Sequence, residues 1–386
     1  MNKIDFNKPY FTGKETTYIE DAVKSSHISG NGKYTKKCHA FFENQFGFQK
    51  VLLTTSCTDA LEMAAILIDI QPGDEVIIPS YTFVSTVNAF AIRGAKIVFA
   101  DSRADHPGID EDSLESLITA KTKAIVPVHY AGIACNMPKI MRIADKHGLF
   151  VIEDAAQAID SFCKNENGEL IPLGKWGHLS AFSFHETKNI ISGEGGMLAI
   201  NDSKFNERAE IIWEKGTNRS QFFRGEVDKY GWVDIGSSFL PSDMIAAFLY
   251  AQLENLEKIQ SKRKEIWNEY FSSLAPLSQK GCFDIPHIPS YATNNAHMFY
   301  LICNNIDERT ALILYLKENG IYSVFHYQSL HKSPFYLQQN KEITLLNSEK
   351  YTDCLLRLPM YFELNKNDVL HIGNAINQFY SMRRPD

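Results

Sequence analysis

Between about residues 50 and 200, short apolar runs alternate with longer segments that mix apolar and polar residues. The short runs have the length of β-strands and lie at residues 51–53, 75–79, 96–100, 124–128, 149–152, 180–184 and 197–200. The longer segments between them, such as those through residues 61–65 and 84–92, predict helices. Strands that are apolar on both faces and alternate with helices predict an α/β fold, with a mostly parallel seven-stranded sheet between layers of helices.

The pattern changes near residue 245. A long helical stretch covers residues 246–271. After it come predicted short strands and one more helix, at residues 297–302, 309–317 and 323–326. Because 386 residues exceed the size at which one hydrophobic core keeps growing, we expect two domains. Residues 1–245 would form an N-terminal arm and a large cofactor-binding α/β domain, and residues 246–386 a linking helix and a small C-terminal α+β domain.

Composition and charge exclude several classes of protein. Hydrophobic residues make up 44% of the chain and charged residues 22%, which is typical of a globular protein with a large core. The net charge of −7 argues against nucleic acid as a bulk electrostatic partner. No apolar run approaches the roughly 20 residues that span a bilayer, and residues 1–6 lack the apolar stretch of a signal peptide. The seven cysteines form no Cys-x-x-Cys pair, so we expect reduced thiols in the cytoplasm and no metal site.

Two chemically interesting residues follow predicted strands. Asp154 closes the run that begins at residue 149, and Lys188 comes shortly after the run 180–184 and before the glycine-rich segment 193–196. In doubly wound folds, ligands bind at the carboxyl ends of the strands, where both residues are expected. A carboxylate that holds a pyridinium nitrogen protonated and a lysine that forms an imine are what a protein contributes to pyridoxal 5′-phosphate (PLP) chemistry. We therefore expect PLP as the cofactor.

Each of these two residues also has a plainer interpretation. Asp154 could cap a helix, and most lysines are solvated surface charges. However, the pair Glu153–Asp154 would be costly to bury at the end of an apolar strand without a cationic partner, which a PLP ring nitrogen would supply. A lysine that is partly desolvated or near other cations has a lowered pKa and can attack an aldehyde, which fits the context of Lys188.

Small and hydroxylated residues fill the segment 54–60, between a predicted strand and a predicted helix. Backbone N–H groups at such a helix start can bind a phosphate. On its own, an ordinary helix cap is the better interpretation of this segment. Only in combination with Lys188 does the segment predict a phosphate site.

Further candidates are single side chains. Gln157 could bond to the ring hydroxyl or face solvent, and Phe83 could cover the ring, although core packing is the simpler interpretation. His297, His326 and His331 could contact substrate phosphates, against the alternative that a lone histidine is a surface or core residue. The sequence carries no motif of a metallopeptidase, a serine hydrolase or a P-loop enzyme.

Six segments of the chain resemble the sugar-nucleotide aminotransferases, the DegT/DnrJ type of fold-type I PLP enzymes. They lie at residues 51–58, 72–76, 79–86, 128–132, 153–157 and 183–189. Each is a moderate signal, but their order and spacing are specific, and the resemblance covers nearly the whole chain. The chain looks most like the bacterial transaminases that make dTDP-4-amino-4,6-dideoxyhexoses with the galactose or glucose configuration.

The resemblance implies a role for each matching position around the cofactor ring. Lys188 would be the Schiff-base lysine and would move a proton between the donor and the cofactor. Asp154 would pair with the ring nitrogen, and Gln157 would contact the ring hydroxyl. Phe83 occupies the ring-stacking position of the family, which reverses the core-packing interpretation.

The resemblance also implies contacts to the cofactor phosphate and the substrates. The backbone of Thr58 and Asp59 and the hydroxyl of Ser183 match the phosphate site. His326 matches a histidine near the sugar nucleotide, and His297 is a second candidate there. For the donor carboxylate, Arg219 is a candidate together with the nearby Arg224, with a solvated loop as the alternative for both.

One segment departs from the family. The family commonly has Gly-x-Asn-x-Arg-Met before the long helix, and its Asn reaches the cofactor phosphate of the neighbouring subunit. In this chain Ser238 stands where Asn is usual, and Leu240 replaces Arg. Ser238 could still donate one hydrogen bond. The resemblance further implies a homodimer with shared active sites.

Together these features predict an enzyme that moves the amino group of L-glutamate to the C4 keto group of dTDP-4-keto-6-deoxyglucose. The product would be a dTDP-4-amino-4,6-dideoxyhexose for surface polysaccharides such as the lipopolysaccharide O-antigen. Alternatives are amination of a 3-keto or UDP-linked keto-sugar and, in another class, a non-catalytic PLP-binding regulatory protein. A PLP-dependent sugar dehydratase is disfavoured, because those relatives carry histidine at the position of Lys188. We expect neither a nucleic-acid nor a membrane partner.

Overall fold

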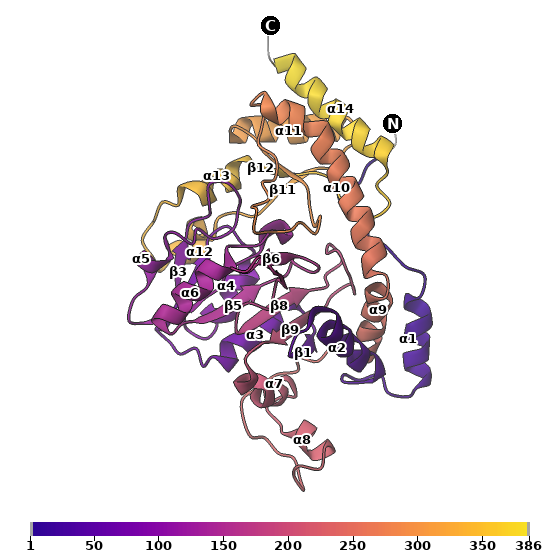
Figure 1. Cartoon of the computed structure of the whole chain (residues 1–386), viewed down its shortest axis with the longest axis vertical. Helices are drawn as coiled ribbons and strands as arrows, with labels where there is room; N and C mark the ends of the chain where they lie inside the picture. Colours follow the sequence, from indigo (N-terminus) through magenta and orange to yellow (C-terminus); the bar gives the residue numbers. More distant parts are fainter. Residues whose placement is uncertain (1–2, 384–386) are drawn as a thin grey trace.

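A seven-stranded sheet with helices on both faces forms the centre of the computed structural model, which describes residues 3–383 (Figure 1). In spatial order the strands are β1 (Lys50–Thr54), β9 (Gly196–Ile200), β8 (Leu179–Ser183), β5 (Phe150–Asp154), β4 (Thr122–Ile125), β2 (Glu75–Pro79) and β3 (Lys96–Ala100). Strand β9 runs antiparallel to both of its neighbours, and the other strands run parallel to one another. The predicted α/β fold with a mostly parallel sheet is therefore confirmed.

Helices cover the two faces of the sheet in two groups. One group is α2 (Lys33–Phe46), α6 (Met137–His147) and α9 (Asp243–Leu253); the other is α3 (Cys57–Leu67), α4 (Val84–Ala91) and α7 (Asn206–Trp213). Successive side chains of a strand point to opposite faces. Accordingly, Val51 and Leu53 pack in the core of the first group, whereas Leu52 packs in the core of the second.

A second, three-stranded antiparallel sheet lies in the C-terminal part of the chain, in the order β10 (Tyr300–Ile302), β12 (Leu355–Arg357) and β11 (Val324–Phe325). It packs with α10 (Leu256–Gln279), α11 (Ile306–Glu318) and α14 (Lys366–Arg383) around a separate hydrophobic core. This agrees with the predicted α+β character of the C-terminal part. The N-terminal arm also reaches this part, because Ile4 pairs with Ile321.

The predicted helix 246–271 is two helices in the structure. Helix α9 ends at Leu253 and α10 begins at Leu256, and Asn255 between them has φ −111° and ψ 13°, outside helical geometry. The side chain of Asn255 donates a hydrogen bond to the carbonyl of Ala251, which α9 leaves free at its end. The break lets α9 stay on the large sheet while α10 leads to the small sheet (Figure 1).

The remaining elements are short or peripheral: α1 (Glu15–Lys24), α5 (Leu114–Leu117), η1 (Tyr130–Gly132), β6 (Phe162–Lys164), β7 (Leu170–Pro172), η2 (Ser203–Phe205), α8 (Arg219–Phe223), η3 (Leu330–Lys332), α12 (Pro334–Leu337) and α13 (Leu346–Cys354). Within residues 3–383, no helix combines the length and the apolar character that crossing a membrane requires.

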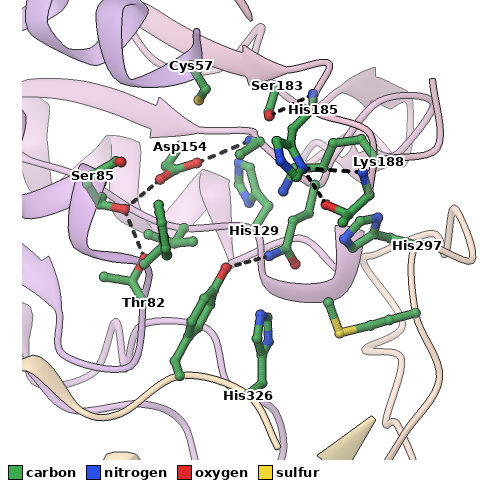
Figure 2. A pocket seen from close by; sticks show the side chains of 18 of the residues that line it. Cys57, Thr82, Ser85, His129, Asp154, Ser183, His185, Lys188, His297 and His326 are labelled. Carbon is green, nitrogen blue, oxygen red and sulfur yellow. Dashed lines mark hydrogen bonds between the residues drawn. The ribbon is translucent and has the colours of Figure 1, made fainter. Parts of the chain in front are cut away.

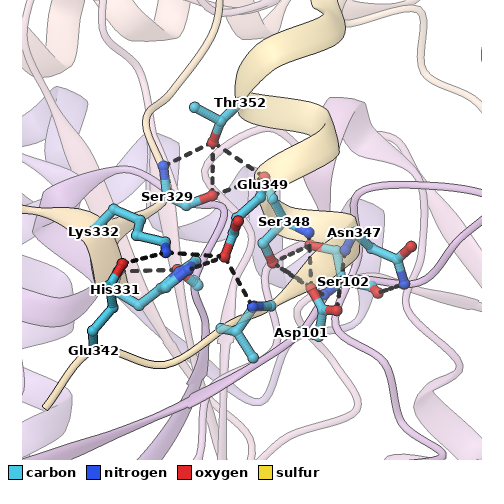
Figure 3. A network of polar contacts seen from close by, with 12 residues as sticks. Asp101, Ser102, Ser329, His331, Lys332, Glu342, Asn347, Ser348, Glu349 and Thr352 are labelled. Carbon is cyan, nitrogen blue, oxygen red and sulfur yellow. Dashed lines mark hydrogen bonds and ion pairs between the residues drawn. The ribbon is translucent and has the colours of Figure 1, made fainter. Parts of the chain in front are cut away.

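A polar network fastens α13 to the carboxyl ends of β2 and β3 (Figure 3). Asp101, directly after β3, accepts hydrogen bonds from the backbone N–H and the hydroxyl of Ser348, both at 2.8 Å. His331 bridges the same two parts, with Nδ1 2.6 Å from the Ser80 hydroxyl and Nε2 3.1 Å from Glu349. His331 therefore lies in this network, fully buried, and not in the cavity described below.

Candidate active site

A cavity of about 880 Å³ opens where the carboxyl ends of the large sheet face the small sheet. Its walls come from the starts of α3 and α4, the ends of β5 and β8, the loop after β8, and the strands β11 and β12. Figure 2 shows side chains from these distant segments pointing into one space. Of the residues singled out in the sequence, Lys188, Asp154, Gln157, Phe83, Thr58, Ser183, His297 and His326 line it.

Asp154 is the last residue of β5 and is 5% exposed. Its Oδ2 accepts a hydrogen bond from the Thr86 hydroxyl at 2.7 Å, and its Oδ1 accepts one from the backbone N–H of Ala156 at 3.1 Å. These two bonds fix the orientation of the carboxylate. Within the described residues no cation forms an ion pair with Asp154, so a positively charged ligand atom can be its partner.

The neighbouring carboxylate, Glu153, has a different environment, because it points to the other face of β5. It is fully buried and accepts hydrogen bonds from the backbone N–H groups of Gly174, Trp176 and Gly177. The Nε2 atom of His129 lies 2.9 Å from it. Glu153 therefore needs no ligand, and only Asp154 of the pair is available to one.

Lys188 lies five residues beyond the end of β8, in a turn that its backbone N–H closes on the carbonyl of His185 at 2.9 Å. Burial lowers the pKa of its amine, and the neighbouring Cys57 and Asp154 partly oppose that effect. Among residues 3–383, no side chain or carbonyl accepts a hydrogen bond from Nζ. An amine with a lowered pKa and no internal partner has the properties of a nucleophile.

The start of α3 offers donors for an anion. Ser56 caps the helix by accepting the N–H of Asp59 at 3.1 Å, while the N–H groups of Cys57 and Thr58 have no partner in the part of the chain that the structure describes. Strand β9 approaches this turn so closely that a Cβ at Gly196 would lie 2.4 Å from the Cys57 nitrogen. The free N–H groups at a helix start suit a phosphate.

Two further side chains, Phe83 and Gln157, line the same cavity as Asp154 and Lys188. Phe83 is 55% exposed although it lines the cavity, and its ring centre is 6.0 Å from that of Tyr327. Gln157 is held by two bonds, accepting from the N–H of Ala131 at 2.6 Å and donating to the Tyr327 hydroxyl at 3.1 Å. An exposed phenyl ring inside a cavity is suited to stacking on a ligand ring.

The two histidines are buried and oriented by neighbours. His297 lines the cavity, and its Nδ1 lies 2.8 Å from the side-chain oxygen of Asn189, while its Nε2 has no partner among residues 3–383. His326 Nδ1 lies 2.7 Å from the Tyr130 hydroxyl. Burial, together with the positive charges of Arg357 and Lys188, holds the pKa of both imidazoles well below the usual value. Both rings are therefore neutral near pH 7.

Three sequence candidates do not reach the cavity of this chain. The N–H of Asp59 is used by Ser56, and its carboxylate accepts a hydrogen bond from the Thr55 hydroxyl. Ser238 is exposed and pairs with Glu214 on the outside of the large sheet. Arg219 opens the short helix α8, at the far end of the molecule from the small sheet, with its guanidinium over the ring of Phe223.

Several cavity residues were not assigned a role from the sequence. Thr86 orients Asp154, and Tyr327 contacts both Phe83 and Gln157. Arg357 lines the cavity from the small sheet. The resemblance could have drawn attention to Thr86, which lies within the matching segment 79–86. No signal in the sequence points to Arg357, because its strand is three residues long.

Comparison with known proteins finds matches to nearly the whole chain. The model of the DegT/DnrJ/EryC1/StrS aminotransferase family matches residues 9–377. An uncharacterised protein of Methanocaldococcus jannaschii is 32% identical over 389 aligned residues, which cover 98% of this chain and 97% of that protein.

Solved structures share the fold over its full extent. The aminotransferase TlmJ from Streptoalloteichus hindustanus superposes with a TM-score of 0.90 at 25% identity, over 99% of this chain and 100% of that chain. DesV from S. venezuelae, in complex with a ketimine intermediate, has a TM-score of 0.88 at 27% identity over 100% of both chains. The resemblance identified in the sequence is thus confirmed at the level of the family.

Proposed function

This chain belongs to the DegT/DnrJ/EryC1/StrS aminotransferase family, and we propose that it moves the amino group of L-glutamate to the C4 keto group of dTDP-4-keto-6-deoxyglucose. The observation that carries the proposal is that Asp154, the last residue of β5, and Lys188, five residues beyond the adjacent parallel strand β8, line one cavity. The choice of this substrate rests on the sequence segments that resemble the dTDP-sugar transaminases.

The cofactor of this aminotransferase is pyridoxal 5′-phosphate. When bound, it supplies an aldehyde that takes up amino groups and a ring that accepts electrons from the reacting carbon. The residues present fit it: within the described range 3–383, the buried carboxylate of Asp154 forms no ion pair and the N–H groups of Cys57 and Thr58 at the start of α3 have no partner. With the Ser183 hydroxyl at the same cavity, these groups would hold the ring nitrogen and the phosphate.

The chain's own residues divide the remaining tasks. Lys188 would take a proton from the donor carbon and return it at the next position, for which its pKa, lowered by burial, is suited. Phe83 would cover one ring face and exclude water from it. Gln157, fixed by Ala131 and Tyr327, would bond to the ring hydroxyl.

The cavity has room for more than the cofactor and a small acid. Its volume of about 880 Å³ is near the upper end of ordinary ligand pockets. A nucleotide held in the outer part would orient the small sugar, because remote binding energy can be used to position the reacting group. His297 and His326, neutral and oriented, would serve as hydrogen-bond partners of the sugar nucleotide. The product would enter the synthesis of a surface polysaccharide.

We further propose a homodimer in the cytoplasm. Large apolar side chains are exposed on and after α8, including Phe223 at 67% and Trp232 at 82%. Contiguous exposed apolar surface of this kind favours an interface with another protein surface. The adjacent Ser238 would then face the cavity of the partner. All seven cysteines are unpaired, which suits a reducing compartment.

The test is incubation of the purified protein with PLP, L-glutamate and dTDP-4-keto-6-deoxyglucose, followed by mass and NMR analysis. A dTDP-4-amino-4,6-dideoxyhexose is expected, and its ring couplings decide between the galactose and glucose configurations. If the keto-sugar is unchanged while a 3-keto or UDP-linked substrate is aminated, the proposed acceptor is wrong. If no keto-sugar nucleotide is aminated, the regulatory alternative replaces the proposal.

A further inference from the structure

Arg357 is a cavity residue whose charge has no ion-pair partner among the residues that the structure describes. It is the last residue of β12, the central strand of the small sheet, paired with Tyr300 on one side and Val324 on the other. Its Nε is sealed from solvent without a hydrogen-bond partner. No ion pair or hydrogen bond of its guanidinium occurs within residues 3–383, and the side chain lines the cavity.

The side chains around Arg357 are aromatic and do not neutralise the charge of its guanidinium. The ring of Phe6, from the N-terminal arm, lies 4.8 Å from its Cζ. Tyr81, Tyr130 and Tyr327 are near enough to interact electrostatically with it, and they supply no negative charge at neutral pH because burial raises the pKa of each hydroxyl. Arginine stays protonated in proteins, so within residues 3–383 a cation remains unpaired here and is available to a ligand anion.

Arg263 shows that the fold satisfies a buried arginine where no ligand is needed. It is buried, and its Nε donates to the carbonyl of Ala296 at 3.1 Å and its Nη2 to the carbonyl of His297 at 2.6 Å. Arg357 has no such carbonyls. Leaving a buried charged donor unpaired is costly, so its place at a cavity wall indicates an anionic ligand.

The cofactor phosphate is not that anion. Its donors would be at the start of α3 and at Ser183, on the large sheet, whereas Arg357 belongs to the small sheet on the other side of the cavity. Lys188 lines the same cavity and interacts electrostatically with Arg357. The anion paired with Arg357 must therefore come with a substrate whose reacting atom is at Lys188.

We propose that Arg357 binds a carboxylate of the amino donor. The inference rests on the proposed function, since the donor nitrogen must reach Lys188 and its carboxylates are only a few bonds away. The diphosphate of a sugar nucleotide lies farther from the reacting carbon, beyond the sugar ring. A planar guanidinium also matches a carboxylate with two parallel hydrogen bonds.

The strand that carries Arg357 is anchored to the large sheet. Strand β12 follows α13 without a break, and α13 is fastened to β3 through Asp101 and Ser348 (Figure 3). The position of the guanidinium relative to Lys188 is therefore set by the same contacts that join the small sheet to the large one. A carboxylate held there would fix the donor before any chemistry occurs.

The test uses the PLP-loaded full-length protein with Arg357→Met, Arg357→Lys and, as control, Arg142→Met, which removes an exposed ion pair with Glu166. Calorimetry measures the binding of glutarate, a dicarboxylate without an amine. Stopped-flow absorbance follows the half-reaction with L-glutamate, and a second half-reaction starts from the pyridoxamine form and dTDP-4-keto-6-deoxyglucose. Thermal unfolding and the visible cofactor band verify that each variant is folded and loaded.

We expect Arg357→Met to weaken glutarate binding and the apparent affinity for L-glutamate by about 100-fold. The lysine variant, a cation without the planar fork, should recover part of this loss, and Arg142→Met should match the wild type. The half-reaction with the keto-sugar should change by less than about threefold. Unchanged glutarate and glutamate binding in Arg357→Met would overturn the inference. A loss confined to the keto-sugar half-reaction would also overturn it, and would assign Arg357 to the diphosphate.

Failure of the proposed function gives a different result. If the wild type consumes L-glutamate with dependence on Arg357 but does not aminate dTDP-4-keto-6-deoxyglucose, the acceptor is wrong and Arg357 keeps its role.

Discussion

Two adjacent residues at the end of β5 have different roles, because their side chains point to opposite faces of the strand. Glu153 and Asp154 are both buried carboxylates. Glu153 is satisfied by three backbone N–H groups and His129, whereas Asp154 has two neutral donors and faces the cavity. Alternation along a strand is sufficient to separate the two roles. At Lys188, likewise, burial and the absence of an internal partner distinguish one lysine from the exposed ones.

Replacing Lys188 by alanine tests the nucleophile. Turnover should fall by more than about 10⁴-fold, because both the covalent attachment and the proton transfer are lost. The visible band of covalently held PLP should disappear, although cofactor bound through Asp154 and the start of α3 can remain. Steady-state assays and absorbance spectra measure both effects. Lys164→Ala, at an exposed lysine, is the control, and activity retained in Lys188→Ala would refute the assignment.

Among the elements, α13 joins the two sheets. Its N-terminal residues are held by the carboxylate of Asp101, and negative charge is favourable at a helix start. Because β12 continues directly from α13, this contact also determines where Arg357 lies. A partly buried residue outside the cavity can in this way affect the site.

Asp101→Ala should lower the free energy of unfolding by about 1–2 kcal/mol, the usual cost of removing a helix cap. The apparent KM for L-glutamate should rise in the same variant, because Arg357 loses its support. Urea unfolding and steady-state kinetics measure these two quantities. Asp112→Ala, which removes an exposed ion pair with Lys139, should change neither. A stability loss without any change in KM would mean that α13 does not position Arg357.

The contact between α2 and β1 depends on pH. His39 of α2 accepts the backbone N–H of Leu53 through Nε2 at 3.0 Å, so its ring must be neutral in the fold. Burial, assisted by the charge of Lys50, lowers the pKa of His39 to about 3. The unfolded chain, with an ordinary pKa of about 6.5, binds more protons below that pH. The contribution of His39 to stability is therefore complete above pH 6.5 and is lost as the pH falls toward 3.

Comparing the wild type with His39→Gln isolates this contribution. Glutamine can accept the same N–H but does not titrate. Between pH 7 and pH 5 the wild type should lose on the order of 1–2 kcal/mol more unfolding free energy than the variant. Urea unfolding at several pH values measures the difference. Parallel pH profiles would contradict a neutral, buried His39.

For the molecule as a whole, the proposed dimer explains the apolar surface on and after α8. This surface lies at the end of the molecule opposite α14 (Figure 1). The chain mass is 43.8 kDa, and the particle in solution should have twice that mass. The proposed division of the chain at residues 245 and 246 remains a prediction that limited proteolysis can address.

Trp232→Glu should shift the particle toward the mass of a single chain, because it places a charge in the apolar surface. Sedimentation analysis measures the mass. Activity should fall with dissociation, since Ser238 would no longer reach the cavity of the partner. Leu370→Glu, on α14, is the matched control and should leave the dimer intact. A wild-type monomer that is fully active would refute the shared site.

The sequence by itself determined the large sheet and most of the candidate site. Most of its seven strands are apolar and buried on both faces, and an apolar run can be recognised in the local sequence, so local patterns predict these strands. Asp154 ends β5, Lys188 comes five residues after β8, and the start of α3 comes shortly after β1. The carboxyl ends of parallel strands share one edge of a sheet, so these residues are expected there. These features depend on short stretches of chain.

Only the tertiary structure decided which distant side chains meet. Arg357 and Tyr327 enter the cavity from strands of two or three residues or from the loops beside them, too short for any periodicity. Glu153 is paired because His129, from another segment, lies beside it, whereas Asp154 faces the cavity. His331 lies outside the cavity, where it is hydrogen-bonded to Ser80, which is also distant in the sequence. The physical reason is that the hydrophobicity of each residue can be read from the sequence. Which charged groups are paired depends on how whole helices and strands pack.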